Sequence, residues 1–430
     1  MTEPLTLSID AMSGDAGPAA VVAGLVRYAR RDETTRFLLF GDAPTLERLL
    51  RRRRAQPLAE RVSVRHASDV VRMDDVPSKA LRTRRDSSMW AAITAVRDGE
   101  ARVCVSCGNT GALLAMSMLI LRKAPGIDRP AIAVHWPSAQ PHGFNTVLDV
   151  GADLRAGPRA LMQYAVLGAE YARLSFGLAK PVVGLLNIGT EPQKGHAELR
   201  LTAEALDKTA ALPEARFTSA GFVEGTDIGG ATVDVIVTDG FTGNIALKTA
   251  EGTAGFIRQG LKDAFAHSPL SRIGQLFALT SLRRLSRRID PRRVNGGVFL
   301  GLNGTVVKSH GRADAVGMDS AVTLATALAE NDYHAAVARE IARLDLSHLP
   351  HGTADSSAAL VSAVDAAWSG GDGAAQRDED AAATMSKPEP KPQPKPEPKP
   401  DPKPGAAGPT VEDAAPTGDK AERAAQEGPR

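Results

Sequence analysis

Short apolar runs that end in polar or glycine-rich corners recur along the first 350 residues. Runs of this length, rich in β-branched residues, predict buried strands, and apolar positions at helical spacing follow them. Strands that alternate with helices are typical of a largely parallel sheet covered on both faces. Ligands of such sheets bind outside the carboxyl ends of the strands, so the corners are the candidate functional positions. The clearest runs are Leu5–Ile9, Val103–Val105, Val147–Val150, Val182–Asn187, Val233–Val237 and Val298–Leu302.

The corner after Val103–Val105 is the most informative of these. It reads Gly108-Asn109-Thr110-Gly111 and leads into the apolar segment Ala112–Leu121, which predicts a strand, a tight loop and a buried helix. The glycines permit close approach to a ligand, and Asn109 or Thr110 can cap the helix. Free amides at a helix N-terminus favour an anion. An ordinary strand-to-helix turn is the alternative, and this stretch alone supports both interpretations equally.

The segment from residue 252 to residue 293 departs from this alternation. Its apolar residues recur at helical spacing, and it carries nine lysines and arginines against two aspartates. A basic amphipathic helix can lie in the interface of an anionic membrane. Alternatively, a second subunit covers the apolar stripe, and the two interpretations carry equal weight. The stripe includes Ile273, Leu276 and Phe277.

The composition changes sharply near residue 350, where an Ala/Gly-rich stretch precedes a segment with proline at every second position, Lys387–Pro404. Such a segment lacks backbone donors and favours extended polyproline II. Its apolar content is too low to offset the entropy of ordering. The sequence therefore predicts one α/β domain over residues 1–350 and a disordered tail over residues 351–430, with a solvated spacer favoured over a Pro-rich ligand.

The composition limits the function classes. A chain of 430 residues with 43% hydrophobic residues and a net charge of +2 can bury a large core. No apolar run reaches the ~18 residues of a membrane span, and the N-terminus lacks the pattern of an export signal, so we expect a cytoplasmic protein. Few aromatic residues and near-neutral charge argue against a nucleic-acid binder. The histidines lack ligand spacing, so we expect no metal site.

The two cysteines, Cys104 and Cys107, match a redox spacing but fit it poorly. In redox sites the pair opens a helix, whereas Cys104 lies inside a predicted strand and alternation turns the two side chains to opposite faces. We interpret them as small buried residues. A role of Cys107 as acyl-carrying nucleophile is a minor hypothesis, which undiminished turnover of a Cys107→Ala variant would end.

The corners supply groups that could hold a phosphate or an oxyanion. Amides and backbone donors bind such oxygens, and a lysine acts on them as a point charge. Neither a Gly-x-Gly-x-x-Gly after the first strand nor a phosphate-binding Gly-x-x-x-x-Gly-Lys motif occurs, which leaves nucleotide binding unsupported. The candidates are the carboxylates Asp10, Asp15, Asp149 and Asp239, the amides Asn109, Asn187, Asn244 and Asn303, the cations Lys194 and Lys308, and His310.

Three arginines, Arg82, Arg84 and Arg85, precede Asp86-Ser87-Ser88, a predicted helix cap. A solvated surface is the simple interpretation, but the same charges suit an acidic partner.

These motifs together resemble those of bacterial phosphate acyltransferases, the PlsX family, over most of residues 5–345. The resemblance lies in Ile9–Asp15, Ala67–Asp75, Leu81–Met89, Gly108–Ala115, Leu148–Ala152, Gly184–Gly189, Asp234–Glu251 and Gly301–Gly311. The chain departs from the family pattern at three positions. Ser13 stands where glycine is usual, Cys107 where alanine is common and Asp153 where asparagine is common.

The resemblance implies transfer of a fatty acyl group from acyl-[acyl-carrier-protein] to inorganic phosphate, giving acyl phosphate for phospholipid synthesis, with no cofactor. It also implies a three-layer α/β/α fold like that of isocitrate and isopropylmalate dehydrogenases, with the amphipathic helical arm protruding. A homodimer, peripheral membrane association and contact with a glycerol-3-phosphate acyltransferase are further implications. A non-catalytic carrier-protein or membrane scaffold and a dehydrogenase on a similar fold are the alternatives, although no nucleotide loop or metal-binding aspartate set is visible.

Phosphate is itself an oxygen nucleophile and a thiolate leaves readily, so direct attack without a covalent intermediate is expected. The enzyme must then place phosphate beside the thioester and stabilise the oxyanion. We assign phosphate binding to Gly108, Asn109, Thr110 and Gly111, and catalytic roles to Lys308, His310, Asp239 and Asn244. Substrate binding falls to Asp10, Asp15, Asn187, Lys194 and Asn303, and carrier docking to Arg82, Arg84, Arg85, Arg283, Arg284, Arg287 and Arg288.

Overall fold

The computed structural model describes residues 4–58, 60–289, 296–330, 333–344 and 346–351. The predicted tail over residues 351–430 therefore lies outside the described residues, apart from His351. Within the described part, no helix is both long and apolar enough to cross a membrane.

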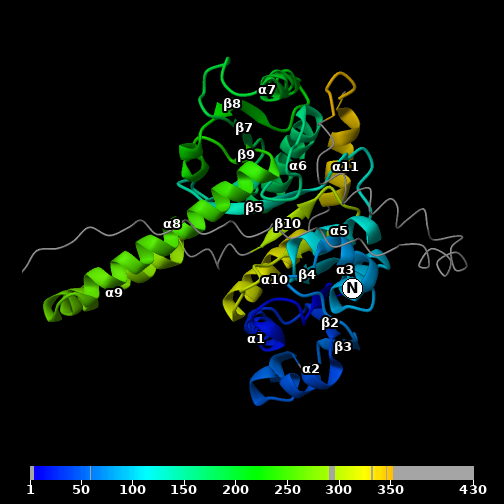
Figure 1. The fold of residues 1–430 in the computed structure, drawn as a ribbon, viewed down its shortest axis with the longest axis vertical. Coiled ribbons are helices and arrows are strands. Elements are labelled where there is room, and N and C mark those ends of the chain that lie inside the picture. Colours follow the sequence, from blue (N-terminus) through cyan, green and yellow to red (C-terminus); the bar gives the residue numbers. More distant parts are fainter. Residues whose placement is uncertain (1–3, 59, 290–295, 331–332, 345, 352–430) are drawn as a thin grey trace, which may run out of the picture. The chain divides into compact units, whose positions relative to one another are not determined.

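The described strands form one eleven-stranded sheet in the order β3-β2-β1-β4-β11-β10-β5-β6-β9-β7-β8 (Figure 1). This confirms the predicted α/β class with a large, mostly parallel sheet. The strands are β1 (Thr6–Asp10), β2 (Arg36–Gly41), β3 (Val62–His66), β4 (Val103–Ser106), β5 (Ala131–Pro137), β6 (Phe144–Leu148), β7 (Val182–Leu186), β8 (Thr218–Val223), β9 (Val235–Val237), β10 (Gly297–Leu300) and β11 (Thr305–Lys308).

The two halves of the sheet run in opposite directions. The pairs from β3 to β11 are parallel, as are those from β6 to β8, but β10 is antiparallel to both β11 and β5, and β5 is antiparallel to β6. The carboxyl ends of the two halves therefore point in opposite directions. In an all-parallel sheet the polar corners would all lie at one edge. That expectation is wrong here, because the antiparallel pairs reverse one half of the sheet.

The register nevertheless brings these carboxyl ends to one level. Lys308, the last residue of β11, pairs with Gly297, which pairs with Val134, and from there the row continues through Val147 to Ile236. Ile236 lies one residue before the end of β9. Because the halves are offset along the strand direction, both sets of strand ends reach a common band across the middle of the sheet.

The segment after the strand run Val298–Leu302 is a hairpin and not the single loop that we predicted. β10 ends at Leu300, and β11 returns antiparallel to it and ends at Lys308. Asn303 therefore lies at the opposite end of β11 from Lys308, five residues and about 16 Å away along the strand. Its side-chain amide donates to the carbonyl of Lys123 at 3.0 Å. A short two-strand pattern with a glycine turn was misinterpreted as strand plus loop.

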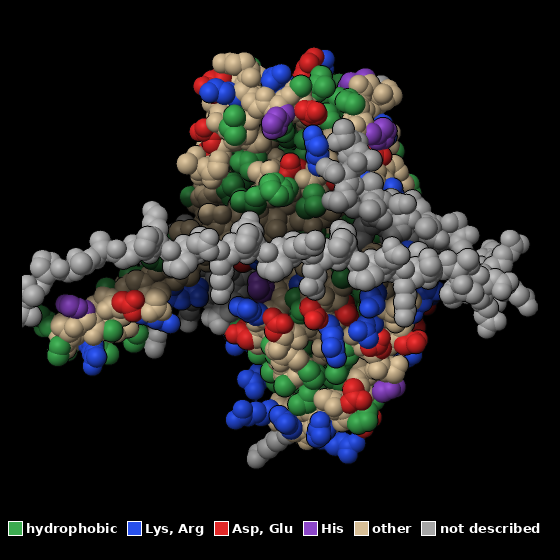
Figure 2. All heavy atoms as spheres, viewed as in Figure 1, with side chains coloured by type: hydrophobic (Ala, Val, Ile, Leu, Met, Phe, Trp, Pro, Cys, Tyr) green, Lys and Arg blue, Asp and Glu red, His purple; other side chains and the backbone are tan. Residues whose placement is uncertain are grey.

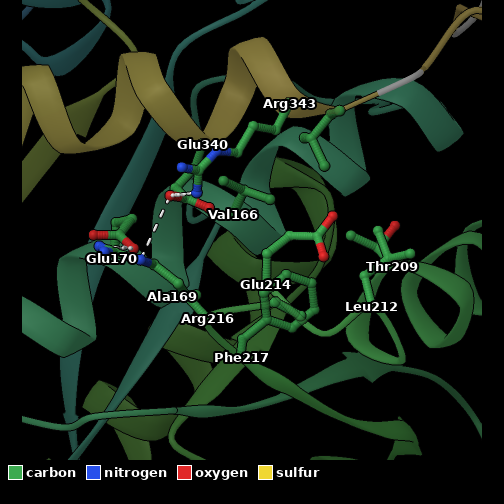
Figure 3. Close-up of a pocket in the computed structure, with 12 residues that line it drawn as sticks. Val166, Ala169, Glu170, Thr209, Leu212, Glu214, Arg216, Phe217, Glu340 and Arg343 are labelled. Carbon is green, nitrogen blue, oxygen red and sulfur yellow. Dashed lines mark hydrogen bonds and ion pairs between the residues drawn. The ribbon is translucent and has the colours of Figure 1, made fainter.

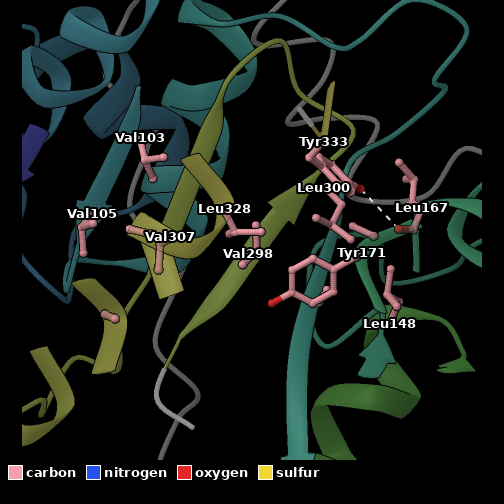
Figure 4. Close-up of a cluster of buried hydrophobic side chains, with 14 of the residues drawn as sticks. Val103, Val105, Leu148, Leu167, Tyr171, Val298, Leu300, Val307, Leu328 and Tyr333 are labelled. Carbon is pink, nitrogen blue, oxygen red and sulfur yellow. Dashed lines mark hydrogen bonds between the residues drawn. The ribbon is translucent and has the colours of Figure 1, made fainter. Parts of the chain in front are cut away.

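Helices cover both faces of the sheet, as predicted. Side chains such as Val103, Leu148 and Val307 pack in one buried cluster with α1, α6 and α10 (Figure 4). Cys104 and Val306 pack in a second cluster with α4 and α5. The helices are α1 (Gly17–Ala29), α2 (Ala43–Leu50), α3 (Pro77–Thr83), α4 (Ser88–Arg97), α5 (Thr110–Ile120), α6 (Pro158–Phe176), α7 (Ala197–Ala210), α8 (Gly240–Ala266), α9 (Pro269–Ile289), α10 (Ala315–Glu330) and α11 (Tyr333–Arg343), with the 3₁₀ segments Arg53–Leu58 and Gly225–Gly229.

The two cysteines lie in different clusters, Cys104 in the one with α4 and α5 and Cys107 in the one with α1 and α10. Alternation along β4 thus places them on opposite faces, as predicted from the strand period. Both are buried free thiols. Burial raises the pKa of both thiols, which opposes formation of a thiolate.

The helical arm begins earlier than predicted. α8 starts at Gly240, directly after β9, and runs to Ala266, and α9 follows from Pro269 to Ile289 (Figure 1). Asp239 caps α8 by accepting a hydrogen bond from the Thr242 amide at 2.7 Å. The first turns of α8 belong to the sheet, since Ala246 and Leu247 pack against the buried cluster that contains Ile236.

Candidate active site

Three polar residues occupy one row on one face of the sheet. Asp10 pairs with Ser106 across β1 and β4, and Ser106 pairs with Lys308 across β4 and β11. Register partners on neighbouring strands point to the same face, so the three side chains adjoin one another. We call Asp10, Ser106 and Lys308 the polar row. All three are buried.

Asp10 is the hydrogen-bonding centre of the polar row. Its carboxylate accepts from Ser88 Oγ at 2.6 Å, from Ser106 Oγ at 2.7 Å and from the Ser13 amide at 3.3 Å. A buried carboxylate needs such donors because an unpaired charge is costly away from water. Asp10 thus ties the start of α4, the end of β4 and the loop after β1 together. Its carboxylate thereby fixes the positions of the Ser88 and Ser106 side chains.

The corner at residues 108–111 opens α5. Asn109 is the helix cap, since its Oδ1 accepts from the Ala112 amide at 3.0 Å, which confirms the predicted cap. Its side-chain NH₂ donates to the carbonyls of Met73 and Asp75, so the amide group is already occupied within the protein. The Gly108 amide donates to Ser106 Oγ at 3.0 Å. Among the described residues, the amides of Asn109, Thr110 and Gly111 have no hydrogen-bond acceptor. These amides face outward at a helix N-terminus, which suits an anion.

Lys308 lies at the end of the polar row. Its ammonium group donates to the carbonyl of Ser309. Burial lowers its pKa to about 8, while the neighbouring Cys107, Asp10 and Asp15 favour the charged form and Lys248 opposes it. Lys308 is therefore a poorly solvated cation, which interacts strongly with an anion that enters the site.

His310 lies two residues after Lys308 and meets the arm. Its Nε2 lies 4.0 Å from Glu251 Oε1, and Glu251 also accepts from Lys248 Nζ at 2.9 Å. His310 Nδ1 accepts a hydrogen bond from the Arg312 amide at 3.2 Å, so the neutral ring carries its proton on Nε2. Burial lowers the pKa of His310. The ring is thus neutral near pH 7 and can donate from Nε2.

Asp239 and Asn244 lie at the N-terminal end of α8, where Asp239 is the cap and Asn244 belongs to the first turns. Gly240 and Gly243 pack directly on Asp149, and Asn244 lies beside Gly151, 3.9 Å from the position of a Cβ there. Glu251, which meets His310, follows Asp239 by twelve residues, or about 18 Å of helix. Asp239 and Asn244 are therefore linked to the polar row along α8, and not by direct contact.

Asp149 holds this end of α8 in place. Its carboxylate is fully buried and accepts from the amides of Ile132 at 2.9 Å, Gly151 at 3.1 Å and Asp153 at 2.6 Å. Burial raises the pKa of Asp149 to about 6, and the backbone donors oppose that rise.

The remaining sequence candidates are dispersed. Asp15 lies near Lys308, and its amide donates to the Gly311 carbonyl at 2.7 Å, so it adjoins the site. Asn187 holds its own loop through the carbonyl of Lys194, and Lys194 is exposed on that loop after β7. Asn303 lies at the far end of β11.

The three arginines near α3 differ in their surroundings. Arg84 forms ion pairs with Asp69 at 2.9 Å and Asp75 at 3.2 Å, which fix the loop between them. Arg85 stacks over the ring of Trp90 at 5.6 Å, and Arg82 is exposed. Arg82 and Arg85 thus present charge to solvent, whereas Arg84 is used within the protein.

The arm exposes a row of apolar side chains (Figure 2). Ile273, Leu276 and Phe277 are 52%, 70% and 85% exposed, and Leu270 and Phe256 are about as open. Arg284 is exposed on the same helix, whereas the side chains of Arg283, Arg287 and Arg288 lie outside the described residues.

A separate pocket lies away from the polar row, between α6, the segment before β8 and α11 (Figure 3). Glu170 pairs there with Arg173 and Arg216, and Glu340 pairs with Arg343. These ion pairs occupy Glu170, Glu340 and both arginines that line the pocket, Arg216 and Arg343, and the lining also includes Glu214.

Several site residues escaped the sequence analysis. Ser106 lies two residues after Cys104, on the same face of a buried strand. A polar residue at such a position indicates a buried polar site. Lys248 lies four residues after Asn244, and Glu251 lies seven residues after Asn244. This spacing places the three side chains on one helical face. Ser88 was recognised only as part of a cap, a role that belongs to Ser87.

Comparison with known proteins supports the resemblance. A family model described as "Fatty acid synthesis protein" matches residues 5–336. The chain is 57% identical over 339 residues to a phosphate acyltransferase of Jannaschia sp. (strain CCS1), covering 79% of this chain and 92% of the relative. It is 58% identical over 336 residues to a phosphate acyltransferase of Dinoroseobacter shibae, covering 78% and 86%. A phosphotransacetylase structure from Streptococcus pyogenes is similar at 16% identity with a TM-score of 0.48, covering 77% of this chain and 95% of that one.

Proposed function

Because the chain belongs to the phosphate acyltransferase (PlsX) family and is an enzyme of lipid synthesis that transfers a fatty acyl group to phosphate, we propose that its two substrates meet at the polar row and the 108–111 corner. The donor in this proposal is an acyl-[acyl-carrier-protein] thioester. A phosphate oxygen forms the bond to the acyl carbon, the carbon–sulfur bond breaks, and the carrier leaves as its thiolate.

Phosphate is bound by the amides of Asn109, Thr110 and Gly111 in this proposal. The helix N-terminus and the nearby ammonium of Lys308 favour its negative charge. The side chain of Asn109 shapes the corner and does not bind phosphate, because its polar atoms already bond within the protein. Lys248 on α8 is close enough to lower the pKa of Lys308 and supplies a second cation, which is paired with Glu251 at 2.9 Å.

The oxyanion that forms at the acyl carbon is stabilised by Lys308 and by the Nε2–H of His310. Both are placed by rigid backbone, Lys308 by β11 and His310 by the hydrogen bond from Arg312. Such preorganised donors lower the barrier because they need no reorganisation during the reaction. Asp239 and Asn244 orient α8, and through it Lys248 and Glu251.

The observation that carries the proposal is the buried cation at the end of the polar row, near backbone amides that have no hydrogen-bond acceptor among the described residues. The test measures phosphate-dependent loss of the thioester and formation of acyl phosphate, with NAD reduction recorded in parallel. Lys308→Ala should lower turnover by ~10²-fold or more if the cation stabilises transition-state charge. The exposed Lys180→Ala serves as the matched control.

Near-normal turnover of Lys308→Ala would remove that role from the lysine. Carrier-protein binding without any thioester consumption by the wild type would favour the scaffold alternative, and NAD reduction would favour the dehydrogenase.

We assign carrier docking to exposed arginines, because a strongly acidic carrier protein is attracted by them. Arg82 and Arg85 are the accessible pair near the 108–111 corner, and Arg84 is excluded since it holds Asp69 and Asp75. Added salt should lower kcat/KM for the acyl carrier substrate, and Arg82→Glu/Arg85→Glu should reduce this salt dependence. A rate insensitive to salt contradicts this docking site.

The exposed apolar row of α9 is our candidate for peripheral membrane contact. Leu270, Ile273 and Phe277 recur at helical spacing, and basic residues on the same helix suit anionic lipid. Leu276→Glu/Phe277→Glu should abolish co-sedimentation with phosphatidylglycerol vesicles, whereas Leu212→Glu should not.

The competing occupant of this row is a second copy of the chain in a homodimer. In that case the same double variant lowers the molecular mass measured by light scattering and leaves vesicle binding unchanged. The 1–350 catalytic domain, the solvated 351–430 tail and contact with a glycerol-3-phosphate acyltransferase remain proposals that rest on the sequence.

A further inference from the structure

The loop between Asp69 and Pro77 is fixed against the 108–111 corner at several points. Asn109 Nδ2 donates to the carbonyls of Met73 at 2.9 Å and Asp75 at 3.0 Å. The ring of Pro77 lies against Gly111, where a Cβ would approach Pro77 Cγ to 2.7 Å. The ion pairs of Arg84 hold both Asp69 and Asp75. A surface loop with so many anchors presents its side chains in a defined place.

Met73 covers the backbone next to His310. A Cβ at Gly311 would lie 2.7 Å from Met73 Cε and 3.5 Å from Met73 Sδ, so the thioether rests directly on that glycine. Met73 is still 41% exposed, and Val76 on the same loop is 59% exposed. The loop thus offers apolar atoms to solvent beside the residues assigned to the oxyanion.

Polar side chains also lie at this position. Asp15, Arg312, Lys248 and Glu251 all lie near His310 or Gly311. A fatty acyl carbon held near Lys308 and His310 must place its first methylenes within a few ångströms of the same residues. Apolar contact is favourable in proportion to the area removed from water, so these methylenes gain most against Met73 and Val76.

We propose that Met73 and Val76 form the wall along which the acyl chain lies, and that this loop sets the chain-length preference of the enzyme. Methionine suits this task because its flexible thioether adapts to chains of different length. The inference rests on the proposed function, since it takes the acyl carbon to react beside Lys308 and His310.

The experiment compares wild type, Met73→Ala, Met73→Gln and Val76→Ala with acyl carrier protein substrates of 4, 8 and 16 carbons. Met73→Gln keeps the length of the side chain and removes its apolar character. Because both residues are exposed, all variants should keep the melting temperature of the wild type. Leu201→Ala is the matched control, since Leu201 is 44% exposed on α7, against 41% for Met73.

We expect Met73→Ala and Met73→Gln to lower kcat/KM for the 16-carbon substrate by about fivefold to tenfold relative to the 4-carbon substrate. Val76→Ala should act in the same direction with a smaller effect. The KM for phosphate should stay within twofold of wild type, and Leu201→Ala should change nothing.

An equal loss for all chain lengths would overturn the inference, because the pantetheine arm common to all donors would then be the group at this loop. A raised KM for phosphate without a chain-length effect would also overturn it, since the loop would then serve the 108–111 corner alone. If the wild type consumed no thioester at all, the proposed function itself would fail.

Discussion

Lys308 combines two properties that oppose one another. It is a cation at the end of a polar row, and it is 9% exposed, so its charge is held where water solvates it poorly. Burial lowers its pKa to about 8, which means that the protonated form still predominates at neutral pH. In the proposed mechanism, phosphate compensates the charge of this poorly solvated lysine. The same burial that destabilises the free cation would then strengthen its interaction with the anion.

The pH dependence of the rate follows from this pKa. The protonated lysine is present below about pH 8 and is lost as the pH rises through that value. We expect kcat/KM for phosphate to fall on the alkaline side with an apparent pKa near 8. Lys308→Arg should keep its charge and move this limb to higher pH, because a guanidinium is not deprotonated in this range. An unchanged alkaline limb in Lys308→Arg would assign the titration to another group.

The sequence around Asn109 predicts its role as a helix cap, but not the partners of its side-chain NH₂ group. Its position after a strand and before an apolar helix predicts the cap. The same side chain was also assigned to phosphate, but its NH₂ group donates to Met73 and Asp75. No spacing in the sequence reveals those two carbonyls, because they lie more than thirty residues away along the chain.

Helix α8 is the element that connects the two groups of polar residues. Its first turn is seated on Asp149, and three turns later Glu251 approaches His310. This close packing of α8 on Asp149 requires glycine, because a Cβ at Gly243 would overlap the carbonyl oxygen of Asp149. Close packing of the start of α8 on the backbone after β6 therefore fixes the part of the helix from which Glu251 approaches His310.

A methyl group added to a helical glycine raises helix propensity, but it can also clash with a neighbouring group. Replacing Gly243 and a second glycine of α8 should separate these two effects. Gly243→Ala should destabilise the protein by about 1–3 kcal/mol, because the added methyl group meets the backbone carbonyl of Asp149. Gly252→Ala, on the same helix, meets nothing within 4 Å and should stabilise it by about 0.5–1 kcal/mol. Urea unfolding of both variants measures the difference. Equal effects at the two positions would show that the contact with Asp149 yields without cost.

The arm shows the limit of periodicity as a predictor. The apolar spacing of residues 273–289 predicts a helix, and α9 confirms it. The pattern also predicts an apolar face that needs a partner, and the exposed side chains of Leu276 and Phe277 agree with this. Periodicity gives no start for α8, since Gly240 and Gly243 disfavour helix and are tolerated only because they pack on Asp149.

At the scale of the whole molecule, two parallel half-sheets of opposite direction are joined by the antiparallel strands β10 and β5. At this joint, the pair of strands β10 and β5, His135 on β5 is a buried histidine. Its ring stacks on that of Tyr171 with 5.1 Å between ring centroids, and its centroid lies 4.8 Å from that of Phe176. Burial lowers its pKa to about 4, and the neighbouring His142 acts in the same direction. The folded joint therefore favours the neutral imidazole.

The free energy of unfolding should therefore depend on pH through this residue. The unfolded histidine titrates near 6.5 and the folded one near 4, so the unfolded state binds more protons between these values. Stability is complete above about pH 6.5 and falls as the pH drops towards 4, by at most about 1.4 kcal/mol per pH unit. His135→Phe should remove this part of the loss.

The measurement is urea unfolding of wild type and His135→Phe at several pH values from 4 to 7. The rise in the pKa of Asp149 acts in the opposite direction in both proteins and cancels in the comparison. His267→Asn, at the exposed end of α8, is the control. Parallel curves for wild type and His135→Phe would show that His135 does not titrate with unfolding.

The sequence by itself determined the α/β class, the corner at 108–111, the cap at Asn109, the amphipathic arm and, through its motifs, the family. These features depend on residues close together in the chain, where period and turn chemistry act. Only the tertiary structure decided which corners meet. The junction of the two half-sheets at β10 and β5 and the row of Asp10, Ser106 and Lys308 depend on pairing between strands far apart in sequence. Which distant strands become neighbours is set by packing of the whole core, whereas a local pattern can reveal only hairpins such as that of β10 and β11.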